Sequence, residues 1–272
     1  MVYQDFLAGM ARYGAARQDV CQWGLGVPSS DICETVILAP WWSPSAFGGL
    51  EETLLSRAPG LPIQVWSVTL SGVRMTWVKT GIGAPVLMDA LLTLGVTGCR
   101  RLLFVGSVGA LDGRMNIGDI VVPAHSICGD GASRYLLADP LGGDDTIGQK
   151  AYPDPSLLAR LTEVTERICG ERGVGWHVGH TFSIDTIFAQ FAHLDAILAL
   201  GCDTIEMETA AAFRAAALAG IPMAALFSVS DNTIANKSLV AGRTGEELEY
   251  RRSVIRETFP RIVAETLATA QG

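Results

Sequence analysis

The alternation of short apolar runs with helix-like segments is the feature that most constrains the fold of this chain. Apolar runs bounded by glycine or proline are typical of buried strands. They occupy residues 35–40, 101–106, 119–123, 175–185 and 223–231. Segments with helical periodicity occupy residues 84–95, 155–173, 209–220 and 245–270. Such alternation predicts one α/β domain, a three-layer sandwich with a mixed, mainly parallel central sheet.

Turn residues and helix ends refine this prediction. Residues 63–81 are predicted to form a hairpin that turns at Ser71-Gly72. Pro260 is expected to kink the C-terminal helical region. Residues 129–155, rich in Gly, Asp and Pro, are expected to form a long loop over a site. Residues 1–30 are predicted to be a helical extension, and residues 31–272 the α/β domain.

Charge and cysteine content disfavour several classes of function. The 272 residues carry a formal net charge of −8 and no basic stripe, which disfavours nucleic-acid binding. The six cysteines lack CxxC spacing, as is typical of free thiols in a reducing compartment. His177 and His180 have no further ligands at metal-site spacing. With neither a membrane span nor a signal peptide in the pattern, we expect a cytoplasmic protein.

Small and polar residues follow several predicted strands where each strand ends. They occupy residues 79–83, 106–109 and 228–232, with a further polar stretch at 203–213. Ligands of open α/β sheets bind beyond the carboxyl ends of strands, so these segments predict a binding site. Each feature also has a structural interpretation. The glycines can serve turns or packing, Glu206 and Glu208 can stabilise a helix N-terminus, and Asp231 can cap a turn.

Together these residues indicate a more specific site. Glu206 and Glu208 are two residues apart in a strand-like stretch, so both are expected to point the same way and to bind vicinal hydroxyls. Asp231 ends a buried strand and is a candidate proton donor, because burial raises the pKa of a carboxyl. Glycine-rich turns allow a flat base or an oxyanion to approach backbone N–H groups.

Four segments make the chain resemble the purine/uridine phosphorylase superfamily, which contains nucleoside phosphorylases and related nucleosidases. They are TGIGAP, FVGSVGALDGRMNIGDIVVP, DTIEMETAAAF and GIPMAALFSVSDN. The resemblance covers residues 34–270. It implies a single α/β domain, a homo-oligomer (dimer, trimer or hexamer), and cleavage of the N-glycosidic bond of a nucleoside in salvage metabolism. It implies no cofactor or metal, with phosphate as co-substrate.

The resemblance assigns roles to the acidic residues. Glu208 matches the glutamate that holds the ribose 2′ and 3′ hydroxyls, and Glu206 matches the acid before it. Met207 matches the methionine under the sugar. Asp231 matches the aspartate that protonates or hydrogen-bonds the purine at N7, so a purine is favoured. The Gln/Arg pair with which pyrimidine-specific members bind uracil is not located in the sequence.

The resemblance also assigns the remaining walls of the site. Gly106 and Ser107 match the loop that contacts phosphate or another oxyanion, and Val108 and Gly109 match its contact with the base. Phe188, in the segment FSIDTIF, matches the position of a base-stacking aromatic residue.

Two departures from the family pattern concern the phosphate site. Phosphorolytic members carry G-D-P-x-R after the first strand, whereas this chain has LAPWWSP at residues 38–44. Phe104 stands where those members have an arginine. Hydrolytic members activate water with a glutamate near the first strand, where this chain has Trp41-Trp42.

Three functions therefore remain open. The first is a phosphorylase whose phosphate charge comes from another residue, the candidates being Arg57, Arg74, Lys79, Arg243 or a neighbouring subunit. The second is a nucleosidase, in which the tryptophans line a pocket for an apolar substituent. The third is a catalytically weak nucleoside-binding protein.

Overall fold

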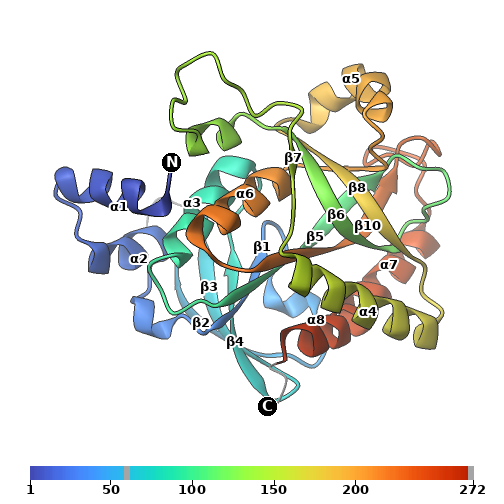
Figure 1. The fold of residues 1–272 in the computed structure, drawn as a ribbon. Helices are drawn as coiled ribbons and strands as arrows, with labels where there is room; N and C mark the ends of the chain where they lie inside the picture. Colours follow the sequence, from blue (N-terminus) through green and yellow to red (C-terminus); the bar gives the residue numbers. More distant parts are fainter. Residues whose placement is uncertain (58–61, 269–272) are drawn as a thin grey trace.

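The computed structural model describes residues 1–57 and 62–268, which form a ten-stranded sheet with helices around it (Figure 1). The strands are β1 (Thr35–Ala39), β2 (Glu51–Arg57), β3 (Gln64–Leu70), β4 (Val73–Lys79), β5 (Arg101–Ala110), β6 (Ile120–Gly129), β7 (Lys150–Ala151), β8 (Trp176–Ile184), β9 (Thr204–Glu206) and β10 (Met223–Asn232). The α-helices are α1 (Tyr3–Arg12), α2 (Arg17–Leu25), α3 (Ala84–Leu94), α4 (Pro155–Arg172), α5 (Ile187–Ala199), α6 (Thr209–Ala219), α7 (Gly245–Glu257) and α8 (Phe259–Leu267).

The sheet is mixed, as predicted. Its strand order is β10-β6-β8-β9-β5-β1-β4-β3-β2, with β7 on β6. Parallel pairs join β1 to β4 and β5, β5 to β10, and β8 to β6 and β9. Strand β10 pairs with both β5 and β6. The path β5-β9-β8-β6-β10 therefore closes on itself, and the sheet is strongly distorted at this end.

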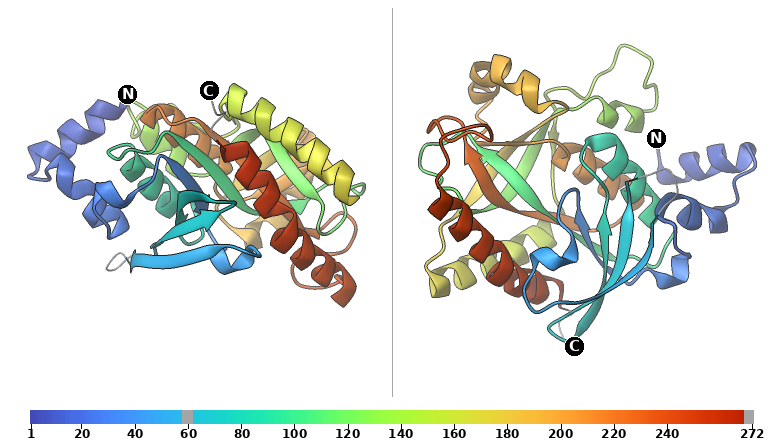
Figure 2. Two further views of the ribbon diagram at one scale, coloured as in Figure 1. Left: turned by 90° about the horizontal axis from the view of Figure 1, so that it is seen from below. Right: turned by 180° about the vertical axis from the view of Figure 1, so that it is seen from behind.

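Helices cover both faces of the sheet, which confirms the predicted layers (Figure 2). On one face, α2, α3 and α6 enclose a core that contains Leu87, Leu91 and Phe213. On the other face, α4, α7 and α8 enclose a second core that contains Leu161 and Phe259. The buried leucines of α3 recur at helical spacing, so burial of one apolar stripe stabilises this helix against the sheet.

The predicted hairpin turn is confirmed by the backbone, and the predicted break in the C-terminal helical region is found near Pro260. Ser71 and Gly72 have φ of 51° and 78°, so both residues of the β3–β4 turn are left-handed, as a tight hairpin requires. The C-terminal helical region is divided at Thr258, and Pro260 lies in the first turn of α8. A proline at that position needs no backbone N–H partner, so it starts a helix and does not break one.

Strand β5 continues through Gly106–Gly109, so the predicted turn at that position is wrong. The residues pair alongside β10 as far as Asn232. A side chain at Gly106 would meet the ring of Phe227 at 3.4 Å. Gly106 therefore lies in an extended strand beside an aromatic ring, and not in a turn.

The region 129–155 also differs from a plain loop. It contains a 3₁₀ turn at Ala132–Leu136 and the short strand β7. None of its residues lines the cavity that lies at the carboxyl ends of the strands. The sequence did not predict β2 and α5.

Helices α1 and α2 lie together at one end of the molecule in all views (Figures 1 and 2). The Tyr3 hydroxyl donates a 2.5 Å hydrogen bond to the Leu92 carbonyl, which links α1 to α3. The six cysteines are free thiols, four of them buried. No helix in the described part of the chain combines the length and hydropathy that a membrane crossing requires.

Candidate active site

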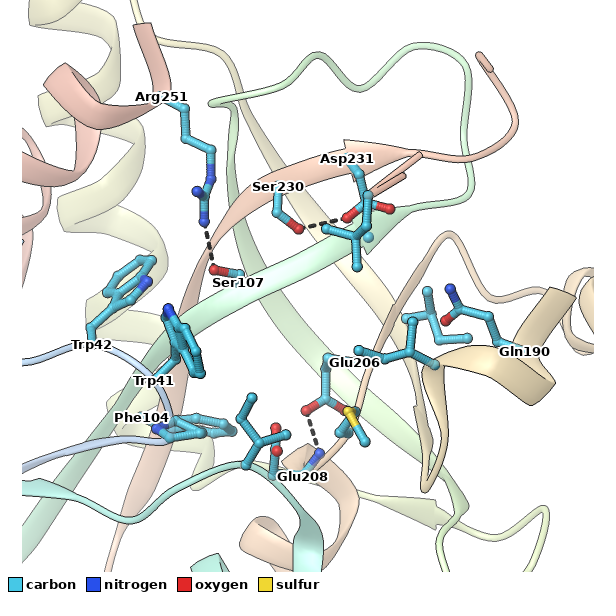
Figure 3. A pocket seen from close by; sticks show the side chains of 18 of the residues that line it. Trp41, Trp42, Phe104, Ser107, Gln190, Glu206, Glu208, Ser230, Asp231 and Arg251 are labelled. Carbon is cyan, nitrogen blue, oxygen red and sulfur yellow. Dashed lines mark hydrogen bonds between the residues drawn. The ribbon is translucent and has the colours of Figure 1, made fainter. Parts of the chain in front are cut away.

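A cavity of about 480 Å³ opens at the carboxyl ends of β1, β4, β5, β9 and β10 (Figure 3). The structure thus brings together the strand ends that the sequence singled out. The predicted residues that line the cavity are Gly106, Ser107, Gly109, Glu206, Met207, Glu208 and Asp231. Its wall also holds Ile82 and Ser230, which belong to the predicted segments 79–83 and 228–232. Gln190 and Arg251 line it as well and were not predicted.

Glu206 is a buried carboxylate engaged mainly by its own surroundings. It accepts hydrogen bonds from the Ser183 hydroxyl at 2.5 Å and from the backbone N–H groups of Glu208 and Thr209 at 2.6 and 2.8 Å. It therefore stabilises the N-terminus of α6, which confirms the structural interpretation of this residue. Burial raises the pKa of Glu206, and these donors oppose the rise.

Glu208 lies at the start of α6 and not in a strand, so the two glutamates do not share one strand face as the spacing predicted. One of its oxygens accepts a 2.6 Å hydrogen bond from the Gly83 N–H. The side chain is only 6% exposed and lines the cavity. Burial, with the neighbouring charge of Glu206, raises the pKa of Glu208 to about 8.

Asp231 lies on β10 across the cavity from Glu208 (Figure 3). It is 3% exposed and accepts a 2.6 Å hydrogen bond from the Ser230 hydroxyl. Burial raises its pKa, against the opposing effect of Ser230 and of two arginines. A Cβ on Gly109 would lie 3.2 Å from an Asp231 oxygen, so glycine is needed at 109 to leave this carboxyl its place.

Strand β5 lines the cavity with Gly106, Ser107 and Gly109. Val108 is 1% exposed, packs in the core and does not line the cavity. Its carbonyl accepts a 3.1 Å hydrogen bond from the Ser230 hydroxyl. The structure therefore does not place Val108 in the wall where a contact with a base was predicted.

Two arginines line the cavity, and the sequence reading named only one of them. Arg243 donates to the carbonyls of Ser230 at 3.2 Å and Leu239 at 2.7 Å. Arg251, on α7, donates a 2.6 Å hydrogen bond to the Ser107 hydroxyl (Figure 3). A single arginine on a helix with many charged residues carries no local sequence signal. Only the packing of α7 beside β5 could reveal it.

The other candidate cations lie elsewhere. Arg74 donates to Ser67 within the β3–β4 hairpin. Lys79 lies over the Trp41 ring, 5.8 Å from its centroid, and does not line the cavity. The Arg57 side chain is outside the described residues.

Aromatic side chains form the wall below Arg251 (Figure 3). Trp41 lines the cavity and is 67% exposed, whereas Trp42 is buried and packs edge-on against Phe259. Phe104 is buried and packs against Phe227. The resemblance predicts phosphate ligands at these positions, but the side chains found there are apolar.

Helix α5 contributes Gln190, not Phe188. The Phe188 side chain is 93% exposed and does not line the cavity of this chain. Gln190 is 5% exposed and points into the cavity. The cavity therefore has a glutamine and two arginines in its wall, although no Gln/Arg pair was recognised in the sequence.

No group of three or more metal-ligating side chains is present among residues 1–57 and 62–268. His177 is paired with Asp119 at 2.8 Å, outside the cavity. The polar side chains that line the cavity carry carboxyl, hydroxyl, amide and guanidinium groups.

The fold and the cavity define an α/β protein with a cavity between buried acids at the ends of its strands. A sequence profile of the phosphorylase superfamily matches residues 50–268, and the chain belongs to that superfamily.

Individual proteins show the same relationship. The uridine phosphorylase of Salmonella typhimurium is 31% identical over 45% of this chain and 44% of its own length. The guanosine phosphorylase of Halorubrum lacusprofundi is 27% identical over 63% of this chain and 67% of its own length. The chain thus matches less than half the length of the Salmonella relative. A crystal structure of uridine phosphorylase from Vibrio fischeri shares the fold, with a TM-score of 0.69 at 19% identity, over 89% and 93% of the two chains.

Proposed function

We propose that this protein cleaves the N-glycosidic bond of a nucleoside by phosphorolysis, and that this nucleoside carries a purine base. The observation that carries the proposal is the placement of two buried carboxyls, Asp231 and Glu208, on opposite sides of one cavity. Asp231 can protonate the base, and Glu208 can bind the hydroxyls of the sugar.

The proposed reaction assigns each group a step. The ribose hydroxyls bind at Glu208, above Met207. The C1′–N bond breaks and its electron pair goes to the base, while an oxygen of phosphate forms the new bond to C1′. The base takes up the proton of Asp231, whose raised pKa favours the protonated form that such a donor requires. Phosphate or solvent then returns a proton to this carboxyl.

Phosphorolysis is favoured over hydrolysis by the charges of the cavity wall. Two guanidinium groups are available to an anion. A hydrolase needs a base for water, but Glu206 is engaged by three donors, and Glu51 and Glu52 are exposed on β2. The relatives named above are phosphorylases of uridine and of guanosine.

The preference for a purine rests on Asp231. Gln190 is placed to bind the polar edge of the base, and its amide can serve either base class. A cytoplasmic location and a homo-oligomeric state accompany the proposal, the latter to be measured by sedimentation.

The test measures by chromatography how much free base is released from inosine, adenosine, guanosine and uridine, with and without inorganic phosphate. We expect purine nucleosides to be cleaved only when phosphate is present, with ribose 1-phosphate as the second product. Equal cleavage in phosphate-free buffer would show a nucleosidase. Binding without cleavage would show a nucleoside-binding protein, and equal rates on uridine and inosine would remove the purine preference.

A further inference from the structure

Arg251 reaches the cavity from an element far from the rest of the site. It lies on α7 and its guanidinium donates a 2.6 Å hydrogen bond to the Ser107 hydroxyl of β5, 144 positions earlier in the chain. Helix α7 is fixed in place by buried Val254 and Ile255 and by a capping box at Thr244. The guanidinium is therefore held by a rigid element and not by a surface loop.

The positive charge of Arg251 is incompletely compensated. Among the described residues it forms no ion pair, and its buried Nε has no hydrogen-bond partner. Burial and, to a lesser extent, the nearby charge of Arg243 lower its pKa to about 10, against the opposing effect of Asp231. Because a desolvated charge is costly unless paired, an anion in the cavity would stabilise this arrangement.

Ser107 places a second hydrogen-bond donor beside the Arg251 guanidinium in the cavity wall. Its hydroxyl oxygen accepts from Arg251, so its own hydrogen is directed to another acceptor. No other partner of this hydroxyl is present among residues 1–57 and 62–268. Arg243, the other cation of the wall, is held by the carbonyls of Ser230 and Leu239. Arg251 is thus the cation with the fewest protein acceptors in this wall.

We propose that Arg251 and Ser107 form the binding site for a tetrahedral oxyanion, and that this anion is the inorganic phosphate of the reaction proposed above. The inference rests on that proposed function. It assigns the charge of the phosphate site to a C-terminal helix, whereas the wall after β1 and at Phe104 is aromatic.

The experiment measures phosphate directly. Calorimetric titration with inorganic phosphate, and initial rates with inosine at increasing phosphate, are compared for wild type, R251Q, R251K and R252Q. Arg252 is the matched control, since it is the next residue of α7 and its side chain is 67% exposed in a surface pair with Glu249. Circular dichroism checks the fold of each variant.

We expect R251Q to raise the Kd and the KM for phosphate by about tenfold or more, as loss of a charge-assisted hydrogen bond predicts. R251K should retain part of the affinity, and R252Q should match wild type. The nucleoside Kd should not change in any variant.

Three results that contradict the proposal can be distinguished from one another. If wild type requires phosphate and R251Q binds it equally well, this site is wrong and the proposed function stands. If wild type neither binds nor requires phosphate, phosphorolysis itself is wrong. Cleavage of a nucleoside 5′-monophosphate that is lost in R251Q, without use of inorganic phosphate, would assign the site to the nucleotide's own phosphate and overturn the proposal. S107A, which keeps the arginine, repeats the test should R251Q fail to fold.

Discussion

Replacement of Glu208 by glutamine tests whether burial dominates the energetics of this site. The carboxyl is 6% exposed, lies beside Glu206, and has its pKa raised to about 8 from the ordinary value of 4.5. Glutamine has nearly the same shape and keeps an oxygen that can accept from the Gly83 N–H at 2.6 Å. The change therefore removes the ionisation and little else.

The sign and size of the effect follow from proton linkage. Below about pH 4.5 the carboxyl is protonated in both states, so ionisation does not affect stability. Between about pH 4.5 and 8 the folded protein holds a proton that the unfolded chain releases, so the free energy of unfolding falls as pH rises. The slope is about 1.4 kcal/mol per pH unit, or about 3 kcal/mol from pH 5 to pH 7.

The measurement is urea unfolding of wild type and Glu208→Gln, followed by tryptophan fluorescence at several values from about pH 5 to about pH 8. We expect the two proteins to have similar stability at the acid end. At the alkaline end the variant should be more stable by about 4 kcal/mol, because it has lost the cost of a buried charge. Glu163→Gln on the exposed face of α4 is the control and should leave the wild-type slope unchanged.

A variant that is less stable than wild type at about pH 8, or that has the wild-type slope, would refute this reasoning. In the first case the Gly83 hydrogen bond to a charged carboxylate would outweigh the desolvation. The same variant should lose nucleoside cleavage by about tenfold or more when assayed above about pH 8, where the wild-type carboxyl is ionised and the sugar hydroxyls lose a charged acceptor.

Three other outcomes follow from the site. Asp231→Asn should bind nucleoside normally but cleave it about a hundredfold more slowly, because the amide has no proton to give; unchanged turnover would exclude Asp231 as the donor. Gly109→Ala should destabilise the fold by about 1–3 kcal/mol and reduce activity, since the added Cβ lies 3.2 Å from Asp231 and from Ile205. Gly113→Ala, with no atom within 4 Å of its Cβ, should have neither effect when melting and activity are compared. Treatment with EDTA should leave the rate of base release unchanged, and loss of activity restored by a divalent ion would show a metal requirement.

Local signals explain why the predicted elements agree with the structure. A turn at Ser71-Gly72 needs only two residues with left-handed backbone, and α3 needs one apolar stripe with a proline near its start. The strands β1, β5 and β10 are apolar runs that cannot be stable unless they are buried.

Elements that depend on distant partners were not predictable in this way. Residues 106–110 remain a strand because β10 pairs with them, a contact between segments more than 100 positions apart. The position of Phe188 matched a family motif, but α5 turns Gln190 inward and leaves Phe188 exposed. Arg251 shows the same limit, because its acceptor Ser107 lies on a different element.

The local charge of the cavity differs from that of the whole chain. The chain carries −8, and the cavity wall holds the three carboxyls of Glu206, Glu208 and Asp231 against two guanidinium groups. Burial raises the pKa of all three carboxyls, and for Glu208 it does so to about 8, so this residue is largely uncharged near neutral pH. Arg251 stays charged, because its pKa of about 10 is well above neutrality. A chain with a net negative charge can therefore still present one positive, desolvated point to a small anion.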